Sequence, residues 1–505
     1  MSEKKPMTRK ELRRRKRRRQ LIIKTVLVCI LALVLVVAIW IVSGGITRMK
    51  EKQAAAKETT ASAETDSESG ASGSSSSGTA AAEGETDPAT ATDERAALIA
   101  QATALAVQYD YEGAIALLNT IPGADTDAEI ISLIADYETA KTTLVPTSPE
   151  NITHIFFHSL VVDPARGFSL TGDSGWDSST VGFCEWMTTV DEFNAILQQM
   201  YERGYVLISI YDMVDETTDE NGVVHITPKD VYLPQGKIPF VLSLDDLSYY
   251  HSYNGRGTAS RMIIGDDGTP TCEYIAADGT QLVGSYDCVP LLDDFLEQHP
   301  DFSYKGAKGT IALTGYDGIL GYRTDYVYRD RVDLSEDQEA WLAANPTFDW
   351  NAECEAAKAV AECIKADGWT FASHTWGHIR IGDADMQWIQ EDTEKWLNYV
   401  EPLIGDTDII IFAHGQDLAA WNEDYASTEK FQYLKSCGFN IYCNVDSSQY
   451  FVQTGDLYLR MGRRNLDGYR LWMAVYGGDD RVSDLIDAST VFDPQRPTDA
   501  SLYNL

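Results

Sequence analysis

Residues 238–246 read IPFVLSLDD and residues 369–378 read WTFASHTWGH, and these two stretches decide the fold class. Each begins with an apolar run of strand length. The first run ends in two adjacent aspartates, and the second ends in two histidines four positions apart. Strands that alternate with helices form mainly parallel sheets, and such sheets build their sites at the carboxyl ends of the strands. The two stretches therefore predict an α/β domain with a site at one edge of its sheet.

The sequence around these stretches alternates in the same way between strand-like and helical patterns. Between residues 255 and 310, Asp-Gly turns separate short β-like runs, which predicts a small β-rich insertion. The other strand-like runs are THIFFHSLVV (153–162), VLISIYDMV (206–214), GTIALTG (309–315), DIIIFAHG (408–415) and FNIYCNV (439–445), and the helical runs are 190–205, 354–367, 388–399 and 427–438.

Composition argues against a chain that is disordered throughout and against a nucleic-acid-binding protein. The chain has 505 residues, with 41 Lys and Arg against 77 Asp and Glu, and a formal net charge of −36. Apolar residues make up 44%, which is enough for a sizeable core. The negative charge argues against nucleic acid as a partner, because that binding depends on Lys and Arg contacts to phosphate.

The N-terminal region has the pattern of a membrane anchor. Residues 13–19 are all basic, and residues 21–43 are almost entirely apolar and long enough to span a bilayer as a helix. Because positive residues stay in the cytoplasm, residues 1–20 are predicted to be a cytoplasmic tail and the rest of the chain to be extracellular. We therefore expect a single-pass protein of the cell membrane. A cleaved signal peptide is the competing interpretation.

Two segments precede the α/β region. Residues 44–93 are rich in Ser, Gly, Ala and Glu, which predicts a disordered linker. Residues 94–146 show helical spacing and predict a helical hairpin, in which YDYEGAIALLNTIPG resembles one tetratricopeptide-type unit. The hairpin is either a neck that packs on the next domain or a docking module for a protein partner.

The cysteines and the acidic turns give no support for other sites. No CxxC occurs among the eight cysteines, which argues against a Cys-based zinc site. Cys354 and Cys363 fall on one predicted helix, about 13 Å apart, which is too far for a disulfide. The Asp-Gly turns of the insertion lack the ligand spacing of an EF-hand.

The residues at the ends of the two deciding stretches suggest metal chemistry. Asp246, His374 and His378 offer one carboxylate and two imidazoles, a common set for catalytic zinc. The two histidines can face one ion if a helical turn begins at His374. Asp245 could then act as a general base. A helix cap at the aspartates and a structural role for the histidines are the alternatives.

With these residues named, the chain resembles the polysaccharide deacetylases, the NodB-homology family, also called carbohydrate esterase family 4. Leu244-Asp245-Asp246 is similar to the first motif of the family, and the segment from His374 to His378 is similar to the second. The resemblance covers residues 152–452. It implies a distorted (β/α) barrel spanning 147–505, a divalent metal, with zinc expected, on Asp246, His374 and His378, and Asp245 as the base.

The chain departs from the family pattern at three places. Leu247 follows the aspartates where members usually have Gly, and residues 413–416 read AHGQ where the third motif has an Arg-Pro pair. The last motif should supply a histidine as general acid, yet His414 is the final histidine of the chain. His414 and His158 are the candidates for that role.

Three further residues are candidates for support of the site. Arg463 and Arg464 could replace the missing arginine of the third motif, although surface charge or an ion pair at the edge of the core is the alternative for both. Trp376 lies between the two motif histidines.

Two hypotheses about function follow. The first is a membrane-anchored, extracellular, metal-dependent hydrolase that acts on C–N amide bonds other than peptide bonds, removing acetyl groups from peptidoglycan or an exopolysaccharide, with N- and O-acetyl groups both open. The second is an inactive relative that binds a glycan or a protein at the cell surface. A different metal-dependent amidase or esterase with the same ligands is a third reading.

Overall fold

The structure is a computed structural model in which residues 88–169 and 178–505 are described. Its largest sheet has nine strands, seven of which close into a ring of parallel neighbours. The ring is formed, in order, by β2 (Thr153–Phe157), β7 (Ile238–Asp245), β11 (Thr310–Leu313), β12 (Thr370–Ser373), β13 (Ile409–Ile411), β14 (Ile441–Val445) and β16 (Tyr458–Asn465). This closed barrel is the α/β architecture that the sequence predicts.

Two shorter strands complete the sheet. β3 (Tyr205–Leu207) runs parallel to the first part of β7, and β15 (Val452–Gly455) runs antiparallel to β16. Because every strand of the ring points the same way, all of their carboxyl ends lie at one end of the barrel.

The pleat of β7 shows how the barrel is filled. Phe240, Leu242 and Leu244 pack into the cluster that the surrounding helices share. Val241 belongs instead to the cluster formed by barrel strands such as β11 and β12. Because side chains alternate along a strand, Ser243 and Asp245 lie on the same face as Val241. The inner face of β7 therefore changes from apolar to polar toward its carboxyl end.

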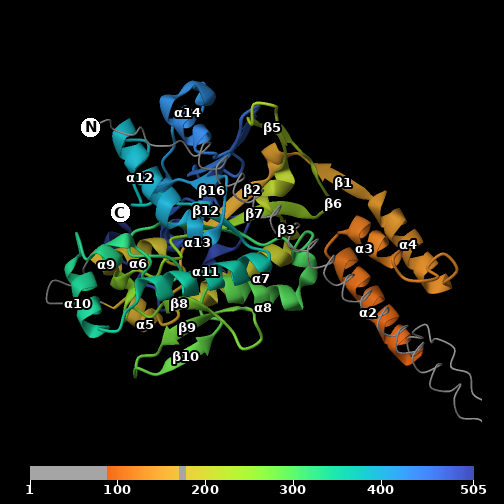
Figure 1. Cartoon of the computed structure of the whole chain (residues 1–505), viewed down its shortest axis with the longest axis horizontal. Helices are drawn as coiled ribbons and strands as arrows, with labels where there is room; N and C mark the ends of the chain where they lie inside the picture. Colours follow the sequence, from red (N-terminus) through yellow and green to blue (C-terminus); the bar gives the residue numbers. More distant parts are fainter. Residues whose placement is uncertain (1–87, 170–177) are drawn as a thin grey trace, which may run out of the picture. The chain divides into compact units, whose positions relative to one another are not determined.

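Helices cover the outside of the barrel (Figure 1). In α7, Phe193, Ile196, Leu197 and Met200 recur at helical spacing and are all buried, and a capping box at Thr189 starts the helix. The helices of this region are α5 (Pro164–Gly167), α6 (Ser178–Trp186), α7 (Val190–Glu202), α8 (Cys288–Gln298), α9 (Tyr326–Asp330), α10 (Glu336–Ala344), α11 (Trp350–Ala366), α12 (Met386–Tyr399), α13 (Glu401–Ile404), α14 (Glu429–Ser436), α15 (Gly468–Trp472) and α16 (Ala488–Val491).

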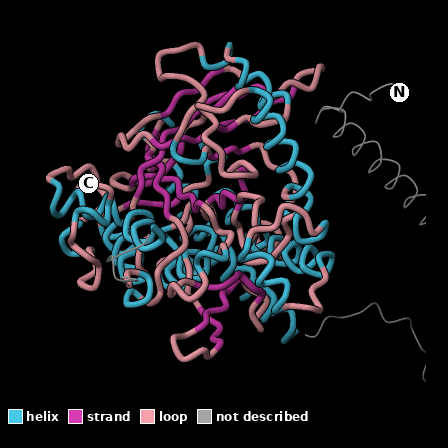
Figure 2. Tube along the Cα trace, turned by 90° about the vertical axis from the view of Figure 1, so that its left-hand side faces the viewer, coloured by secondary structure: helices cyan, strands magenta, loops and turns pink. Residues whose placement is uncertain are grey.

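The insertion contains an antiparallel meander of β8 (Ala259–Ile264), β9 (Pro270–Ile275) and β10 (Gln281–Gly284). Its strands lie apart from the barrel strands, at the lower end of Figure 2. Two small antiparallel pairs flank the barrel: β4 (Val214–Thr218) with β5 (Val224–Pro228), and β1 (Leu144–Thr147) with β6 (Val231–Pro234).

Three helices precede the barrel: α2 (Pro88–Val107), α3 (Tyr111–Leu118) and α4 (Ala128–Lys141). The hydroxyl of Tyr109 donates to the carbonyl oxygen of Asp301 at 2.8 Å, which ties the turn between α2 and α3 to the barrel region. α2 begins at Pro88, so the last residues of the predicted linker are helical.

Some sequence-based expectations differ from the structure or lie outside it. The strand predicted over 206–214 ends at Leu207, because Ser209 and Asp212 form a capping box that starts a 3₁₀ turn. The basic tail, the predicted anchor and the linker up to residue 87 lie outside the described residues. Among the helices that are described, none is long and apolar enough to cross a bilayer.

Candidate metal centre and active site

The carboxyl ends of β7 and β12 bring the predicted metal ligands together. Asp246 follows β7, while His374 and His378 follow β12, which is separated from β7 in the ring by β11. One ligand atom from each of these three residues lies within 4.8 Å of the others. Asp246 and His374 are buried, and His378 is half-buried. The set therefore has the residue types of a zinc site, and they lie close enough together that one divalent ion could be held between them.

The histidines converge through a turn rather than through the helical turn that their spacing suggests. Thr375 and His378 have φ values of 64° and 51°, in the left-handed region that non-glycine residues rarely adopt. Asp246 is in the same region, with φ of 56°. All three lie at the candidate site, where a constrained backbone aims the side chains at one point.

Hydrogen bonds from neighbouring groups orient the ligands. Nδ1 of His374 donates to the carbonyl oxygen of Ile411 at 2.8 Å, which leaves Nε2 as the nitrogen with a lone pair. The hydroxyl of Tyr250 donates to Oδ1 of Asp246 at 2.6 Å, while Oδ2 lies 3.4 Å from Nε2 of His378. His374 and Asp246 are therefore each held with one polar atom available, which fits a divalent ion.

Asp245 is fixed by a buried arginine. Arg463, on β16, is completely buried and donates to both carboxylate oxygens of Asp245, at 2.6 and 2.9 Å. Burial raises the pKa of Asp245, but Arg463 and His374 outweigh burial and leave that pKa below its usual range. Asp245 is thus held as a carboxylate, with one oxygen 3.9 Å from Nε2 of His374.

Arg463 also belongs to a hydrogen-bonded chain of polar side chains inside the barrel, which includes Ser243 and His154. Its guanidinium also donates to Oγ of Ser243 at 3.1 Å, and that oxygen lies 3.0 Å from Nε2 of His154. Burial and the charge of Arg463 hold the pKa of His154 well below its usual range. Because His154 is neutral and Asp245 is paired with Arg463, none of these buried side chains carries an uncompensated charge.

We predict a large stability loss for Arg463→Met. The change leaves Asp245 buried without its partner, which should lower the free energy of unfolding by about 3–5 kcal/mol. Chemical denaturation measures the effect. Arg464→Met is the matched control, because Arg464 pairs with the partly exposed Asp484 and should cost less. Combining Arg463→Met with Asp245→Asn should restore part of the loss; an undiminished loss in the double variant would contradict the pairing.

A third carboxylate holds the turn that carries the histidines. Asp392, on α12, accepts hydrogen bonds from the backbone N–H groups of Trp376 and Gly377, both at 2.7 Å. Burial raises the pKa of Asp392 to about 6, although these two backbone bonds lower it. The carboxylate satisfies two donors between His374 and His378, and so sets the separation of the two imidazoles.

We predict that Asp392→Asn weakens zinc binding about 10–100-fold, the range for changes in the groups that orient metal ligands. An amide keeps one acceptor oxygen but loses the second. Titration with zinc against a competing chelator measures the affinity. Asp385→Asn, in the exposed N-cap of the same helix, is the control and should leave zinc affinity unchanged. Equal affinities in both variants would contradict the assigned role.

The two candidate general acids occupy different places. His414 has its Nε2 donating to the carbonyl oxygen of His378 at 3.1 Å, and its ring contacts the His378 ring at a centroid distance of 4.3 Å. His158 follows β2, at the same end of the barrel as Asp245 and Asp246. Its buried Nδ1 has no hydrogen-bond partner among the described residues.

The remaining candidates separate into two groups. Arg463 reaches the site, whereas Arg464 points to the other side of β16 and binds Asp484. The backbone N–H of Trp376 donates to Asp392, while its ring packs against Tyr326 and lies under the ammonium group of Lys395.

Sequence reasoning missed Tyr250 and Asp392. Tyr250 lies four residues after Asp246, a spacing that could have suggested a contact if a turn had been expected there. Asp392 lies 15 residues from Gly377, in the first half of a predicted helix, where an acidic residue usually faces solvent. No local signal singles it out.

Comparisons with known proteins add little to this geometry. No family model and no curated protein matches the chain. One similar solved structure is the Streptococcus pyogenes deacetylase PplD in complex with acetate, 13% identical, over 63% of this chain and 93% of that chain, with a TM-score of 0.31. A likeness of this size carries no conclusion about activity. The closed parallel barrel, with an Asp-Asp pair after β7 and two histidines after β12, fits a NodB-type polysaccharide deacetylase.

Proposed function

We propose that the protein is a metal-dependent carbohydrate deacetylase that hydrolyses an N-acetyl or O-acetyl group on a glycan. The convergence of Asp246, His374 and His378 beside an arginine-paired Asp245 is the observation that carries the proposal. A divalent ion, with zinc expected, would supply Lewis-acid chemistry toward the acetyl carbonyl and a water molecule.

The residues of the chain supply the rest of the chemistry. Asp245 would take the proton from the attacking water, as a carboxylate that Arg463 keeps ionised and aimed. Tyr250 would hold Asp246 in place through its hydrogen bond to Oδ1. His158, which follows β2 and whose buried Nδ1 has no hydrogen-bond partner among the described residues, would give a proton to the leaving group. His414 would position His378 by donating to its carbonyl oxygen.

The setting is proposed on sequence grounds. The basic run before an apolar stretch supports a single membrane-spanning helix, with the tail in the cytoplasm and the barrel outside the cell. In that place the acetylated substrate would be peptidoglycan or an exopolysaccharide. The α2–α4 helices would serve as a neck or as the docking site for a protein partner.

Acetate release by the zinc-loaded full chain from N- and O-acetylated glycans tests the proposal. The binding-module alternative rests on the missing late histidine and the changed third motif. Binding of a glycan without release of acetate would favour that alternative.

A further inference from the structure

A cavity lies outside the candidate metal centre. It has a volume of about 540 Å³ and is bounded by the meander, the loop after β11, the end of α10 and the first turns of α11. This volume is within the range of about 300–1,000 Å³ typical of small-molecule sites. Its lining includes the aromatic rings of Tyr322, Trp341 and Phe348 and the amides of Asn254, Gln281 and Asn345.

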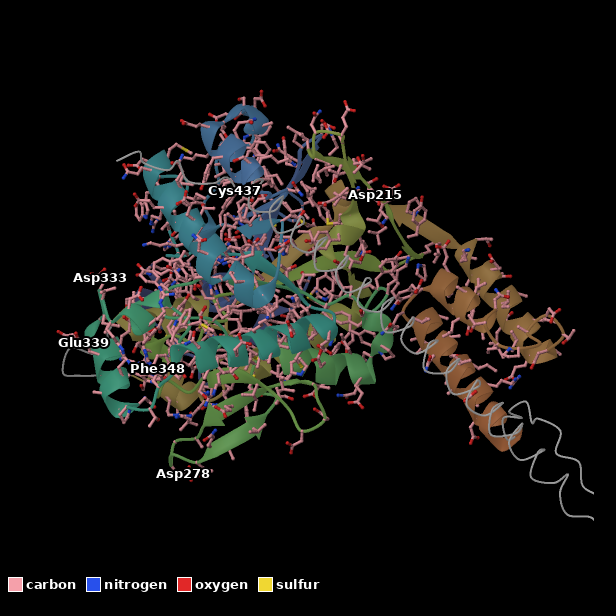
Figure 3. The ribbon with its side chains drawn as sticks, viewed as in Figure 1. Asp215, Asp278, Asp333, Glu339, Phe348 and Cys437 are labelled. Atoms are coloured by element: carbon pink, nitrogen blue, oxygen red, sulfur yellow. The ribbon has the colours of Figure 1, made fainter. Side chains whose placement is uncertain are left out.

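The aromatic side of the cavity is formed by two rings that meet edge to face. Trp341 and Phe348 have centroids 5.1 Å apart, and their planes meet at 81°. Both side chains are half-buried, and Figure 3 places Phe348 beside α10. Arg331 lies over the ring of Phe348, and Tyr328 packs against Trp341, so each ring leaves only part of its surface open to the cavity. That part is apolar, and the C–H face of a sugar ring can pack against it.

The two arginines around the cavity are already paired: Arg261 forms an ion pair with Glu273, and Arg323 donates to Asp317 at 3.1 Å. The other two carboxylates of the lining, Asp349 and Glu353, accept hydrogen bonds from backbone N–H groups. A lining with paired arginines and further carboxylates gives little attraction to a phosphate or another anionic ligand. Amide side chains carry both donors and acceptors, as the hydroxyl groups of a sugar require.

We propose that this cavity binds a neutral oligosaccharide, at a subsite separate from the metal centre. The aromatic side of the cavity would stack on sugar rings, and the amides of Asn254, Gln281 and Asn345 would bind their hydroxyl groups. No phosphate, nucleotide or lipid fits this combination as well, because the lining offers neither unpaired positive charge nor a wholly apolar wall.

The cavity wall is joined to the candidate active site. Arg323 donates to the carbonyl oxygen of Tyr249 at 3.0 Å, and the next residue, Tyr250, donates to Asp246. Gly321, also in the lining, has its N–H 3.2 Å from the carbonyl oxygen of Ser248. A glycan chain held here would raise the local concentration of its acetylated part at the metal centre; this consequence rests on the proposed function.

Calorimetric titration of the full chain with the neutral hexamers of N-acetylglucosamine, glucose in β-1,4 linkage and glucose in α-1,4 linkage tests the proposal. Ala352→Trp, an exposed lining residue in the first turn of α11, should fill the cavity and weaken binding by at least about tenfold. Glu355→Trp, exposed on the same helix but outside the lining, should bind as the parent does. Phe348→Ala is the second variant if Ala352→Trp does not fold.

The titrations use a His374→Ala background, so that binding is read without turnover and independently of the deacetylase proposal. Binding of at least one hexamer, lost in Ala352→Trp and kept in Glu355→Trp, would support the subsite. Binding of none of the three, or equal binding in both tryptophan variants, would overturn it.

Discussion

Asp245→Asn is expected to lower kcat for acetate release by about 100- to 10,000-fold, the contribution of a general base, while zinc stays bound. The substitution keeps the shape of the side chain and removes its ability to take a proton. Asp246, His374 and His378 are untouched, so the metal content should not change. Single-turnover kinetics and zinc analysis by mass spectrometry measure the two quantities on one sample.

The control for this variant is Asp484→Asn. Asp484 is also a carboxylate paired with an arginine of β16, but its partner is Arg464 and it lies outside the candidate site. We expect its kcat to equal that of the parent chain. A kcat for Asp245→Asn within a few-fold of the parent would exclude Asp245 as the base.

His374→Ala is expected to lose zinc altogether at micromolar metal, and with it all release of acetate. The variant removes one of three ligands, so its effect should exceed the about 10–100-fold that changes in orienting groups cost. His225→Ala is the control, because His225, on β5, pairs with Asp456 in the turn between β15 and β16 and does not belong to the predicted ligand set.

Dialysis against buffered zinc gives the stoichiometry of each histidine variant. Full zinc occupancy in His374→Ala would mean that the ion is held elsewhere. Loss of zinc from both variants would point to unfolding, which circular dichroism detects.

The sequence pattern is sufficient to predict the α/β class and the closeness of Asp246, His374 and His378, while the closed barrel is implied by the family resemblance. The runs that end at Asp245 and Ser373 are apolar and of strand length, and the residues that follow them lie at the carboxyl ends of parallel strands in any α/β sheet. Proximity of the ligands therefore follows from the fold class. The spacing alone could not predict the backbone of the histidine segment, because left-handed residues such as Thr375 depend on tertiary contacts.

The partners of the site residues are harder to predict. Arg463 and Asp245 are 218 positions apart, and only the register that places β16 and β7 on either side of β2 brings them into contact. The adjacent Arg464 looks identical in sequence and points away. Which arginine faces the barrel interior depends on the pleat of β16, and a one-residue change of register would exchange them.

The histidine proposed as general acid is also hard to predict from the sequence. His414 and His158 both follow barrel strands, so sequence could not rank them. The structure separates them by their hydrogen bonds. Nε2 of His414 donates to a backbone carbonyl, whereas Nδ1 of His158 has no partner in the part of the chain that the structure describes.

The most direct test is acetate release by the zinc-loaded full chain across a panel of chitooligosaccharides, peptidoglycan fragments and O-acetylated glycans. We predict release from at least one member, abolished by chelation, restored by zinc and absent in Asp245→Asn. No release from any member by protein that holds one equivalent of zinc would contradict the proposed activity.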